Sequence, residues 1–567
     1  MKSEKDGLYP LQALVQSISL RFKYHFEGTR QTNRLDKPEW YFTHVLNASH
    51  EHRAFMENIV QRLLSSTEYR HIIAWREFTY LLLPLLHRKL RRTVPALVPH
   101  PPILAHTIYQ ALSFDSALKE EGFEIRGTSA TASKGKDGKQ EEKEQKWEGV
   151  SEVILGRREW FEAWMEGERV FAMDQYMEII SAQDAWLIID DTGDDDESVI
   201  DRELKPTNSA RRVKALVEQV TDRYSPLPQF VHRTRFMIVV QLPLLESYHA
   251  RISSSLDAFE TLSSTFMRAV PGALGSDPAR PGDPKRLTSG VDGVQRLCKA
   301  LVSAKYLAAA MEAWGEDLFF LELWSEINRK AALRSRAEAA VSLPDPKGAE
   351  DDVPEGTIFE ELVVQYGKLV GRAEEMIVHT VCSEVESSLR AHLISGNSTQ
   401  STPASNVDGD HDIGLPPTLL GPIALLSSHL TYLQSSLPQA TVTTLYRRIA
   451  SHLATHILQR AIMYRGCARI SPQEGKTIMT ECELWVETCR HALSRSSGRA
   501  EAPWRPLLQA GRIVGAQGDS WRRIVDATLG RTTDQDWETV MLDAVGLAEL
   551  SREDVSQAVK ARADSGM

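Results

Sequence analysis

The chain has 567 residues, a formal net charge of −11, 42% hydrophobic residues and 25% charged residues. This composition is ordinary for a globular protein, and the length suits roughly three or four domains. Phosphate binding requires a basic footprint, so the acidic balance argues against a nucleic-acid interface over the whole surface and leaves room only for a local basic patch. Five scattered cysteines, an odd number, indicate a reducing compartment: Cys298, Cys382, Cys467, Cys482 and Cys489.

The first twenty residues lack the uninterrupted apolar core of a signal peptide, because Gln12, Gln16, Ser17 and Ser19 break it. The strongest apolar run, residues 80–86, is far shorter than the roughly 20 residues that cross a bilayer. We therefore expect a cytoplasmic protein that reaches membranes only peripherally, through partners or through a surface patch.

Residues 20–42 (LRFKYHFEGTRQTNRLDKPEWYF) combine many aromatic and cationic side chains. The aromatic residues are Phe22, Tyr24, Phe26, Trp40, Tyr41 and Phe42, and the cations are Arg21, Lys23, Arg30, Arg34 and Lys37. Gly28 and Pro38 stand where the chain would turn, so the stretch predicts a structural corner with aromatic rings inside and cationic groups outside. The alternation over residues 21–26 is also typical of a base-stacking platform, but a single short alternation in an acidic protein supports that interpretation weakly.

Residues 8–112 read as an N-terminal helical bundle. Apolar residues recur at steps of three and four at Ile72, Trp75, Phe78, Leu82 and Leu86. We expect the prolines that follow to end this pattern: Pro95, Pro99, Pro101 and Pro102. Residues 113–149 are predicted to be a disordered insertion, because the segment 127–146 has no large apolar residue with which to offset the entropy of ordering.

Residues 150–271 are predicted to form a second helical domain. Its first helix would bury Phe161, Trp164, Val170, Met173, Met177 and Ile180. An acidic loop follows at residues 190–197. A later stripe consists of Met237, Val240, Leu244, Tyr248, Ile252, Leu256, Phe259 and Phe266, with a kink expected at Pro243. Residues 272–290 are rich in proline and glycine and read as a linker.

Residues 291–394 are predicted to be a third helical domain, 395–417 a disordered linker and 418–567 a C-terminal helical domain. The third domain carries two stripes: Leu297, Leu301, Ala304, Ala308 and Met311, then Phe359, Leu362, Tyr366, Leu369, Ala373, Ile377, Val381, Val385 and Leu389. The last domain carries Val442, Leu445, Ile449, Leu453, Ile457, Ala461 and Tyr464. With no sustained period-two alternation, the sequence predicts an all-α fold, an elongated rod of stacked helical bundles rather than a regular solenoid.

Two short motifs invite a test for ligand chemistry. Residues 473–477 (QEGKT) look like part of a phosphate-binding loop, but Ile470 stands where the first glycine is needed and no buried strand precedes it. His452 and His456 share a helix face, but Leu453 replaces the glutamate of a zinc protease motif and no third ligand is evident. We therefore expect two solvated histidines and no nucleotide site.

Other candidate sites are equally incomplete. Cys482 and Cys489 lack a CxxC pairing and are expected to be buried small hydrophobes. The acidic loop at 190–197 lacks the glycine at the sixth position of a calcium-binding EF-hand, which favours a solvated loop. No nucleophile stands beside a base. The sequence thus predicts a protein that is not an enzyme, with no catalytic, cofactor or metal residues, and it leaves the partner-binding residues unassigned.

Five blocks of the sequence resemble one known family. RFKYHFEGTRQTNRLDKPEWYF is similar to the signature of the RINT/TIP family of vesicle-tethering subunits. The other blocks follow in family order: WFEAWMEGERVFAMDQYMEIISAQDAW, TDRYSPLPQFVHRTRFMIVVQLPLLESYHARI, YLAAAMEAWGEDLFFLELW and LYRRIASHLATHILQRAIMYRGCARISPQEGKTIMTECELW. The resemblance implies a helical-bundle fold like that of exocyst-like tethers, with no catalytic residues to carry over.

The resemblance also implies partners and a location. Family members are subunits of the Dsl complex (NRZ in animals) at the endoplasmic reticulum, where they bind other tether subunits and SNAREs in Golgi-to-ER retrograde transport of COPI vesicles. Faces of the helical bundles would then bind partner helices. A nuclear adaptor in DNA-damage checkpoint signalling is the alternative function, and an unrecognised enzyme or a helical scaffold with unrelated partners stays open.

One departure from the family concerns the N-terminal coiled-coil region that precedes the signature and pairs with a partner subunit. Here the signature begins near residue 20. We expect most of that region to be missing, either because the sequence is truncated or a fragment, or because the chain lacks that partnership.

Overall fold

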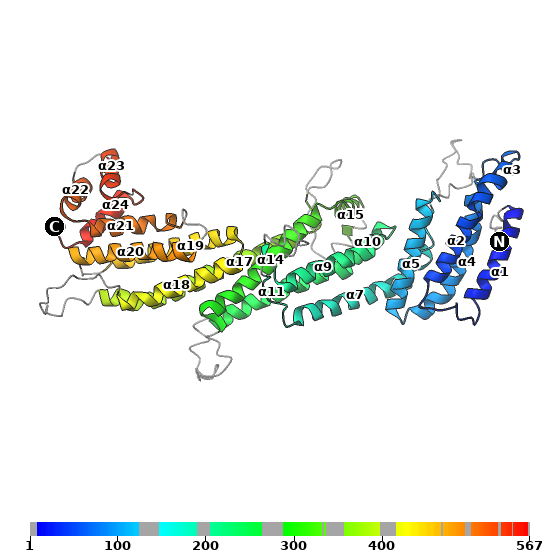
Figure 1. The fold of residues 1–567 in the computed structure, drawn as a ribbon, viewed down its shortest axis with the longest axis horizontal. Coiled ribbons are helices and arrows are strands. Elements are labelled where there is room, and N and C mark those ends of the chain that lie inside the picture. Colours follow the sequence, from blue (N-terminus) through cyan, green and yellow to red (C-terminus); the bar gives the residue numbers. More distant parts are fainter. Residues whose placement is uncertain are drawn as a thin grey trace, which may run out of the picture. The chain divides into compact units, whose positions relative to one another are not determined.

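The computed structural model describes most of the chain and contains helices joined by turns and loops (Figure 1). The described residues are 8–123, 147–189, 204–263, 287–330, 334–335, 356–396, 416–465, 469–493, 500–530, 534–546 and 548–564. Within these ranges the only β-structure is two isolated bridges, Ile188 with Thr207 and Ile470 with Arg562. The predicted all-α class is confirmed. The segment 127–146, the acidic loop 190–197, most of the linkers 272–290 and 395–417, Phe266 and Cys467 lie outside the described residues.

Contacts divide the chain into two units. The first consists of Met1–Ser181, Val213–Glu246 and Gly315–Ile358, and the second of Ala182–Arg212, Ser247–Trp314 and Phe359–Met567. Among the described helices, the residue boundaries of the units fall within α9 (Asn208–Tyr224), α11 (Leu242–Ser263) and α14 (Gly290–Gly315). The division into four helical domains that the sequence suggests stays a prediction.

The remaining helices fall within single units. The first unit holds α1 (Tyr9–Phe26), α2 (Glu39–Phe55), α3 (Gln61–Ser65), α4 (Ala74–Leu97), α5 (Pro101–Glu120), α6 (Glu152–Leu155), α7 (Arg158–Ser181), α10 (Phe230–Phe236) and α15 (Leu318–Arg329). The second holds α17 (Glu360–Gly396), α18 (Pro417–Ser436), α19 (Gln439–Ile457), α20 (Pro472–Ala492), α21 (Arg505–Gly515), α22 (Gly518–Leu529), α23 (Asp534–Val545) and α24 (Arg552–Ala561). In the part of the chain that the structure describes, π-helical turns interrupt the longer helices at Met56–Val60, Met237–Gln241 and Leu458–Met463.

The predicted corner joins α1 to α2, and most of its aromatic rings are buried. Phe22, Phe26, Tyr41 and Phe42 are each at most 6% exposed. The expectation is wrong for Tyr24 and Trp40, which are 54% and 40% exposed. Successive helical residues are rotated by about 100°, so in α1 the ring of Tyr24 cannot share the inward face of Phe22 and Phe26.

The buried side chain of Lys89 on α4 fixes this corner from inside. Its Nζ donates to the Phe26 carbonyl oxygen at 2.8 Å, where α1 ends, and to Asn33 Oδ1 at 2.6 Å in the loop. Burial lowers the pKa of Lys89. The loop is thus held by a cation that periodicity alone would place at the surface.

The helix boundaries around residues 95–120 differ from the prediction. Pro95 lies in the last turn of α4, and Pro101 and Pro102 begin α5, because the first positions of a helix need no amide donor. Residues 113–120, expected to be disordered, form the last turns of α5, where Phe114 and Leu118 are buried.

The buried carboxylate of Asp115 holds the chain where it returns at residue 147. It accepts hydrogen bonds from the amides of Val150 at 2.7 Å and Ser151 at 2.9 Å, just before α6. Burial raises the pKa of Asp115 to about 6. The expected disorder up to residue 149 is therefore wrong at its end as well, since Trp147 packs edge-on against Phe123.

Two predicted apolar stripes run through a π-helical turn, which adds a residue to the helical turn. The described part of the first stripe, Met237 to Phe259, is buried across the π turn Met237–Gln241 and α11, and Pro243, the position of the expected kink, is the second residue of α11. On α19 the stripe holds to Ile457, but the π turn Leu458–Met463 rotates the next residues. Ile462 is therefore buried in place of Ala461, and Tyr464 is 62% exposed. The stripe from Phe359 to Leu389 on α17 is buried throughout.

Candidate partner-binding sites

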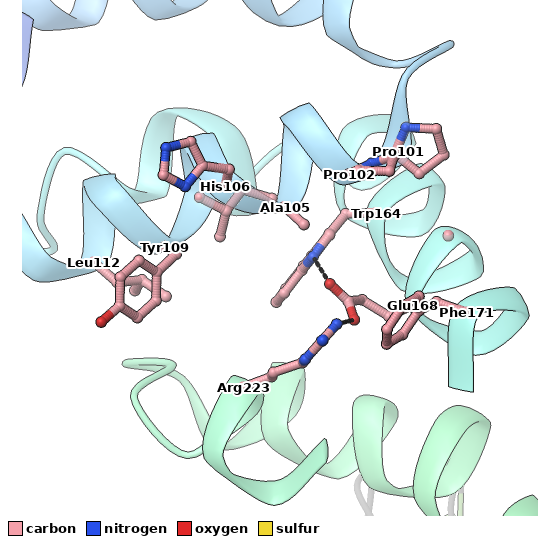
Figure 2. Close-up of a pocket in the computed structure, with 12 residues that line it drawn as sticks. Pro101, Pro102, Ala105, His106, Tyr109, Leu112, Trp164, Glu168, Phe171 and Arg223 are labelled. Atoms are coloured by element: carbon pink, nitrogen blue, oxygen red, sulfur yellow. Dashed lines mark hydrogen bonds and ion pairs between the residues drawn. The ribbon is translucent and has the colours of Figure 1, made fainter. Parts of the chain in front are cut away.

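An apolar pocket of about 350 Å³ lies between α5, α7 and α9 in the first unit (Figure 2). Proline and aromatic side chains dominate its wall, and Tyr109 and Phe171 are 61% and 41% exposed, so it opens to solvent. Its volume is at the lower end of the range for ligand pockets and is large enough for one large side chain. It is lined by Pro101, Pro102, Ala105, His106, Ile108, Tyr109, Leu112, Trp164, Gly167, Glu168, Phe171 and Arg223.

A glycine brings two of the helices close enough to form this pocket. A Cβ built on Gly167 of α7 would lie 2.6 Å from Pro101 Cβ, at the start of α5. Any larger residue would force the helices apart. The two prolines that begin α5 therefore meet α7 directly and form one end of the pocket.

The polar part of the pocket is an internal ion pair. Glu168 is only 6% exposed, accepts a hydrogen bond from Trp164 Nε1 at 3.1 Å and pairs with the Arg223 guanidinium (Figure 2). Arg223 also lies over the Phe171 ring, with Cζ 4.6 Å from its centroid. Carboxylate, indole and guanidinium are thus mutually satisfied, and the pocket offers an apolar surface with one cation at its edge rather than acid–base chemistry.

This pocket was not predicted from the sequence, and the α7 stripe shows why. The buried positions of α7 include Trp164, Glu168, Ala172 and Tyr176, whereas Val170 and Met177, expected inside, are 45% and 54% exposed. A search for apolar periodicity skips Glu168 because it is charged. The signal that could have revealed the buried face is that every fourth residue from Trp160 to Tyr176 lies on the same side of the helix.

The histidine pair on α19 is not simply solvated, as the sequence suggested. His452 Nε2 and His456 Nδ1 lie 3.4 Å and 3.5 Å from the same carboxylate oxygen of Glu386 on α17. Burial lowers the pKa of His456. Over the described ranges, no group of three or more His, Cys, Asp and Glu side chains is arranged to hold a metal ion.

The QEGKT motif forms the first turns of α20 rather than a loop. Ser471 caps the helix in a reciprocal capping box with Glu474. A Cβ on Gly475 would lie 1.9 Å from the Val514 carbonyl oxygen, so this glycine allows α20 and α21 to pack closely. The predicted roles of Cys482 and Cys489 are confirmed: both are buried on α20, and burial raises the pKa of the Cys489 thiol to about 12.

The described structure defines a class: an all-helical protein of packed bundles that carries an exposed apolar pocket. Among its described helices, none is long and apolar enough to cross a bilayer. The model of the RINT-1/TIP-1 family matches residues 9–468. This chain belongs to that family, and the expected membership is confirmed.

Two curated relatives and one solved structure show the same relationship. The chain is 25% identical over 314 residues to a RINT1-like protein of Drosophila melanogaster, covering 55% of this chain and 35% of the fly protein. It is 21% identical over 331 residues to protein transport protein tip20 of Schizosaccharomyces pombe, covering 58% and 41%. The chain thus matches less than half the length of these relatives.

The structural likeness extends further. A crystal structure of the SNARE Sec20 bound to the Dsl1 complex subunit Tip20 contains a chain that matches with a TM-score of 0.58 and 13% identity, covering 97% of this chain and 79% of that one. This match confirms the fold expected from the family.

Proposed function

We propose that this chain is a non-enzymatic subunit of an ER-associated vesicle-tethering complex. It would act in Golgi-to-ER retrograde transport of COPI vesicles by binding SNAREs and other tether subunits. It would work on the cytoplasmic side of the endoplasmic reticulum membrane, as a peripheral component.

The observation that carries this proposal is the fold match over 97% of the chain to the structure in which Tip20 is bound to the SNARE Sec20. Family membership over residues 9–468 and the likeness to a yeast protein transport protein support the same function. The alternative of a nuclear adaptor gains no support from these relatives. The stacking platform on which it relied is also missing, since Tyr24 and Phe22 point to different sides of α1.

A non-catalytic role agrees with the chemistry of the pocket. Its carboxylate is buried and paired, and its remaining wall is apolar. Such a pocket suits a large apolar side chain presented by a partner helix, in the mode in which helices dock into grooves. We assign it as one contact for a SNARE or tether-subunit helix.

Purification of the tagged chain from its own cells, with identification of partners by mass spectrometry, tests the proposal. We expect ER SNAREs and the other Dsl-type subunits among the recovered proteins. Recovery of neither class, from cells in which both are expressed, would overturn the proposed function.

A variant that fills the pocket tests whether the pocket is a partner contact, independently of the proposed tethering function. Ala105→Trp should fill much of the space and weaken the affinity for at least one helical partner about fivefold or more, since a buried anchor contributes over 1 kcal/mol to such interfaces. Ala96→Trp, at an exposed position of α4 outside the pocket, is the matched control. If Ala105→Trp binds every partner as well as the control does, the pocket is not a contact and the tethering role stands on the other evidence.

A further inference from the structure

A cationic patch stands at the C-terminal end of α1, where the basic run of α4 lies beside it. The patch consists of Lys23 and Arg30 from α1 and the loop after it, and of Arg88, Arg91 and Arg92 from α4. Neither the pocket nor the corner packing accounts for these cations. Among the described residues, Lys23 and Arg91 form no ion pair with a carboxylate, and both are exposed.

A single carboxylate ties the two helices together here. Glu27 accepts hydrogen bonds from Arg88 Nε at 2.8 Å and from Arg92 Nη1 at 2.9 Å. Lys23 and Tyr24 stand one turn before Glu27 and therefore on the same side of α1. Lys23 and the α4 cations are thus parts of one surface, with one anion, Glu27, among five cations.

The charge of this region is opposite to that of the chain. Residues 8–123 contain 14 Lys and Arg and 10 Asp and Glu, whereas the whole chain carries a net charge of −11. Like charges that are held together without partners cost stability through repulsion. An anionic partner would remove that cost, which makes the patch complementary to a negative surface.

Exposed apolar side chains stand within the patch. Leu20 and Tyr24 lie four residues apart on one face of α1 and are 61% and 54% exposed. The Arg30 guanidinium lies over the Tyr24 ring, with Cζ 4.5 Å from its centroid. This face of the Tyr24 ring is therefore closed to a stacking base, whereas the edge of the ring and Leu20 stay exposed and can contact an apolar surface.

We propose that this patch binds the surface of membranes that contain anionic phospholipids, with the cations at the headgroups and Leu20 and Tyr24 at the boundary with the acyl chains. Anionic membranes attract clustered Lys and Arg, and apolar neighbours add affinity when they enter the interface. A free phosphate would need convergent donors, and a nucleic acid would gain nothing from Leu20. The proposal is independent of the SNARE-binding function.

Co-sedimentation of the full chain with vesicles tests it. Vesicles of phosphatidylcholine alone are compared with vesicles that include phosphatidylserine and phosphatidylinositol, at low and physiological ionic strength. Binding should require the anionic lipids and weaken with salt. The variant Lys23→Gln/Arg91→Gln should lower the partition coefficient roughly twenty-five-fold, since each such cation near an anionic surface contributes about a fivefold factor.

The matched control removes charge elsewhere. Arg522→Gln/Arg523→Gln acts on α22 of the second unit, where both side chains are exposed, and should leave the partition coefficient almost unchanged. A second variant, Leu20→Ser/Tyr24→Ser, keeps every charge and should reduce binding severalfold. The proposal is overturned if anionic vesicles do not bind at low salt, if the control loses as much binding as the patch variant, if the Leu20→Ser/Tyr24→Ser variant binds as well as the native chain, or if duplex DNA or an acidic peptide competes fully at equal charge.

Discussion

Gly475 provides the sharpest test of how the second unit is packed. In Gly475→Ala the new Cβ would lie 1.9 Å from the Val514 carbonyl oxygen and 2.8 Å from the Val514 carbonyl carbon. Contacts below 3.0 Å essentially do not occur, so α21 would have to move by about 1.1 Å. The two helices α20 and α21 cannot slide past each other to make that room, because they are also closely packed at two other positions. Gly511 of α21 lies against Cys482 of α20, and Gly515 lies against Met479.

The expected cost follows from two opposing terms. Overpacking against backbone belongs at the upper end of its usual range, about 3 kcal/mol. Alanine favours a helix over glycine by about 1 kcal/mol. The net loss is therefore about 2 kcal/mol, which would accelerate hydrogen exchange in α20 and α21 about thirtyfold where exchange follows local opening.

For a matched glycine in open space, we expect a stability change of the opposite sign. Gly367 lies inside α17, and a Cβ built on it meets no atom within 4 Å. Gly367→Ala should therefore stabilise its helix by about 1 kcal/mol and slow hydrogen exchange about fivefold. Hydrogen exchange with mass spectrometry on both variants gives the comparison. If Gly475→Ala proves neutral or stabilising, as Gly367→Ala should be, close packing is not the reason for this glycine.

Three further predictions concern buried charged groups. The pKa of Asp115 is raised to about 6 in the fold from 3.8. The contribution of this group to the free energy of unfolding is therefore fully present below about pH 4 and is lost as the pH rises to 6. Asp115→Asn should remove up to about 3 kcal/mol of that pH dependence, measured by urea unfolding at each pH. Arg562→Lys should destabilise the second unit by about 2–4 kcal/mol in calorimetry, because Arg562 is 1% exposed and binds Asp564 through two nitrogens, whereas Arg522→Lys at the surface should be neutral. Glu168→Met should cost about 1–2 kcal/mol by leaving the part-exposed Arg223 unpaired, and Met at both positions should recover most of it in a double-mutant cycle.

Long apolar stripes were predictable because tertiary packing and helical periodicity agree there. The stripe on α17 was predicted from Phe359 to Leu389, and every one of its residues is buried. Periodicity failed where the backbone leaves the α-helical step. The π turn before Tyr464 shifts the register by one residue, and residue types give little warning of it because the turn contains neither proline nor glycine.

The candidate pocket could not be predicted, for a different reason. Its wall combines residues from three helices that are far apart in sequence, and its central pair joins Glu168 to Arg223 across 55 positions. A short stretch of sequence around Glu168 shows only a charged residue within an apolar stripe, and such a residue is predicted to be exposed. The two prolines that begin α5 were predicted to end a helical pattern, and nothing in the sequence indicated their contact with Gly167.

Buried charge therefore marks the places where this sequence specifies tertiary structure beyond periodicity. Lys89 binds the end of α1, Glu168 binds α9, and Arg562 donates to the Val514 carbonyl oxygen at 3.0 Å beyond the end of its own helix. An apolar residue at any of these positions could pack in several registers, but a charged group that loses its partner pays a large desolvation penalty. We infer that each of the three charges favours one register of its helix over the alternatives. Lys89 then holds the corner beside the cationic patch, Glu168 the wall of the pocket, and Arg562 the end of α21, which packs on α20.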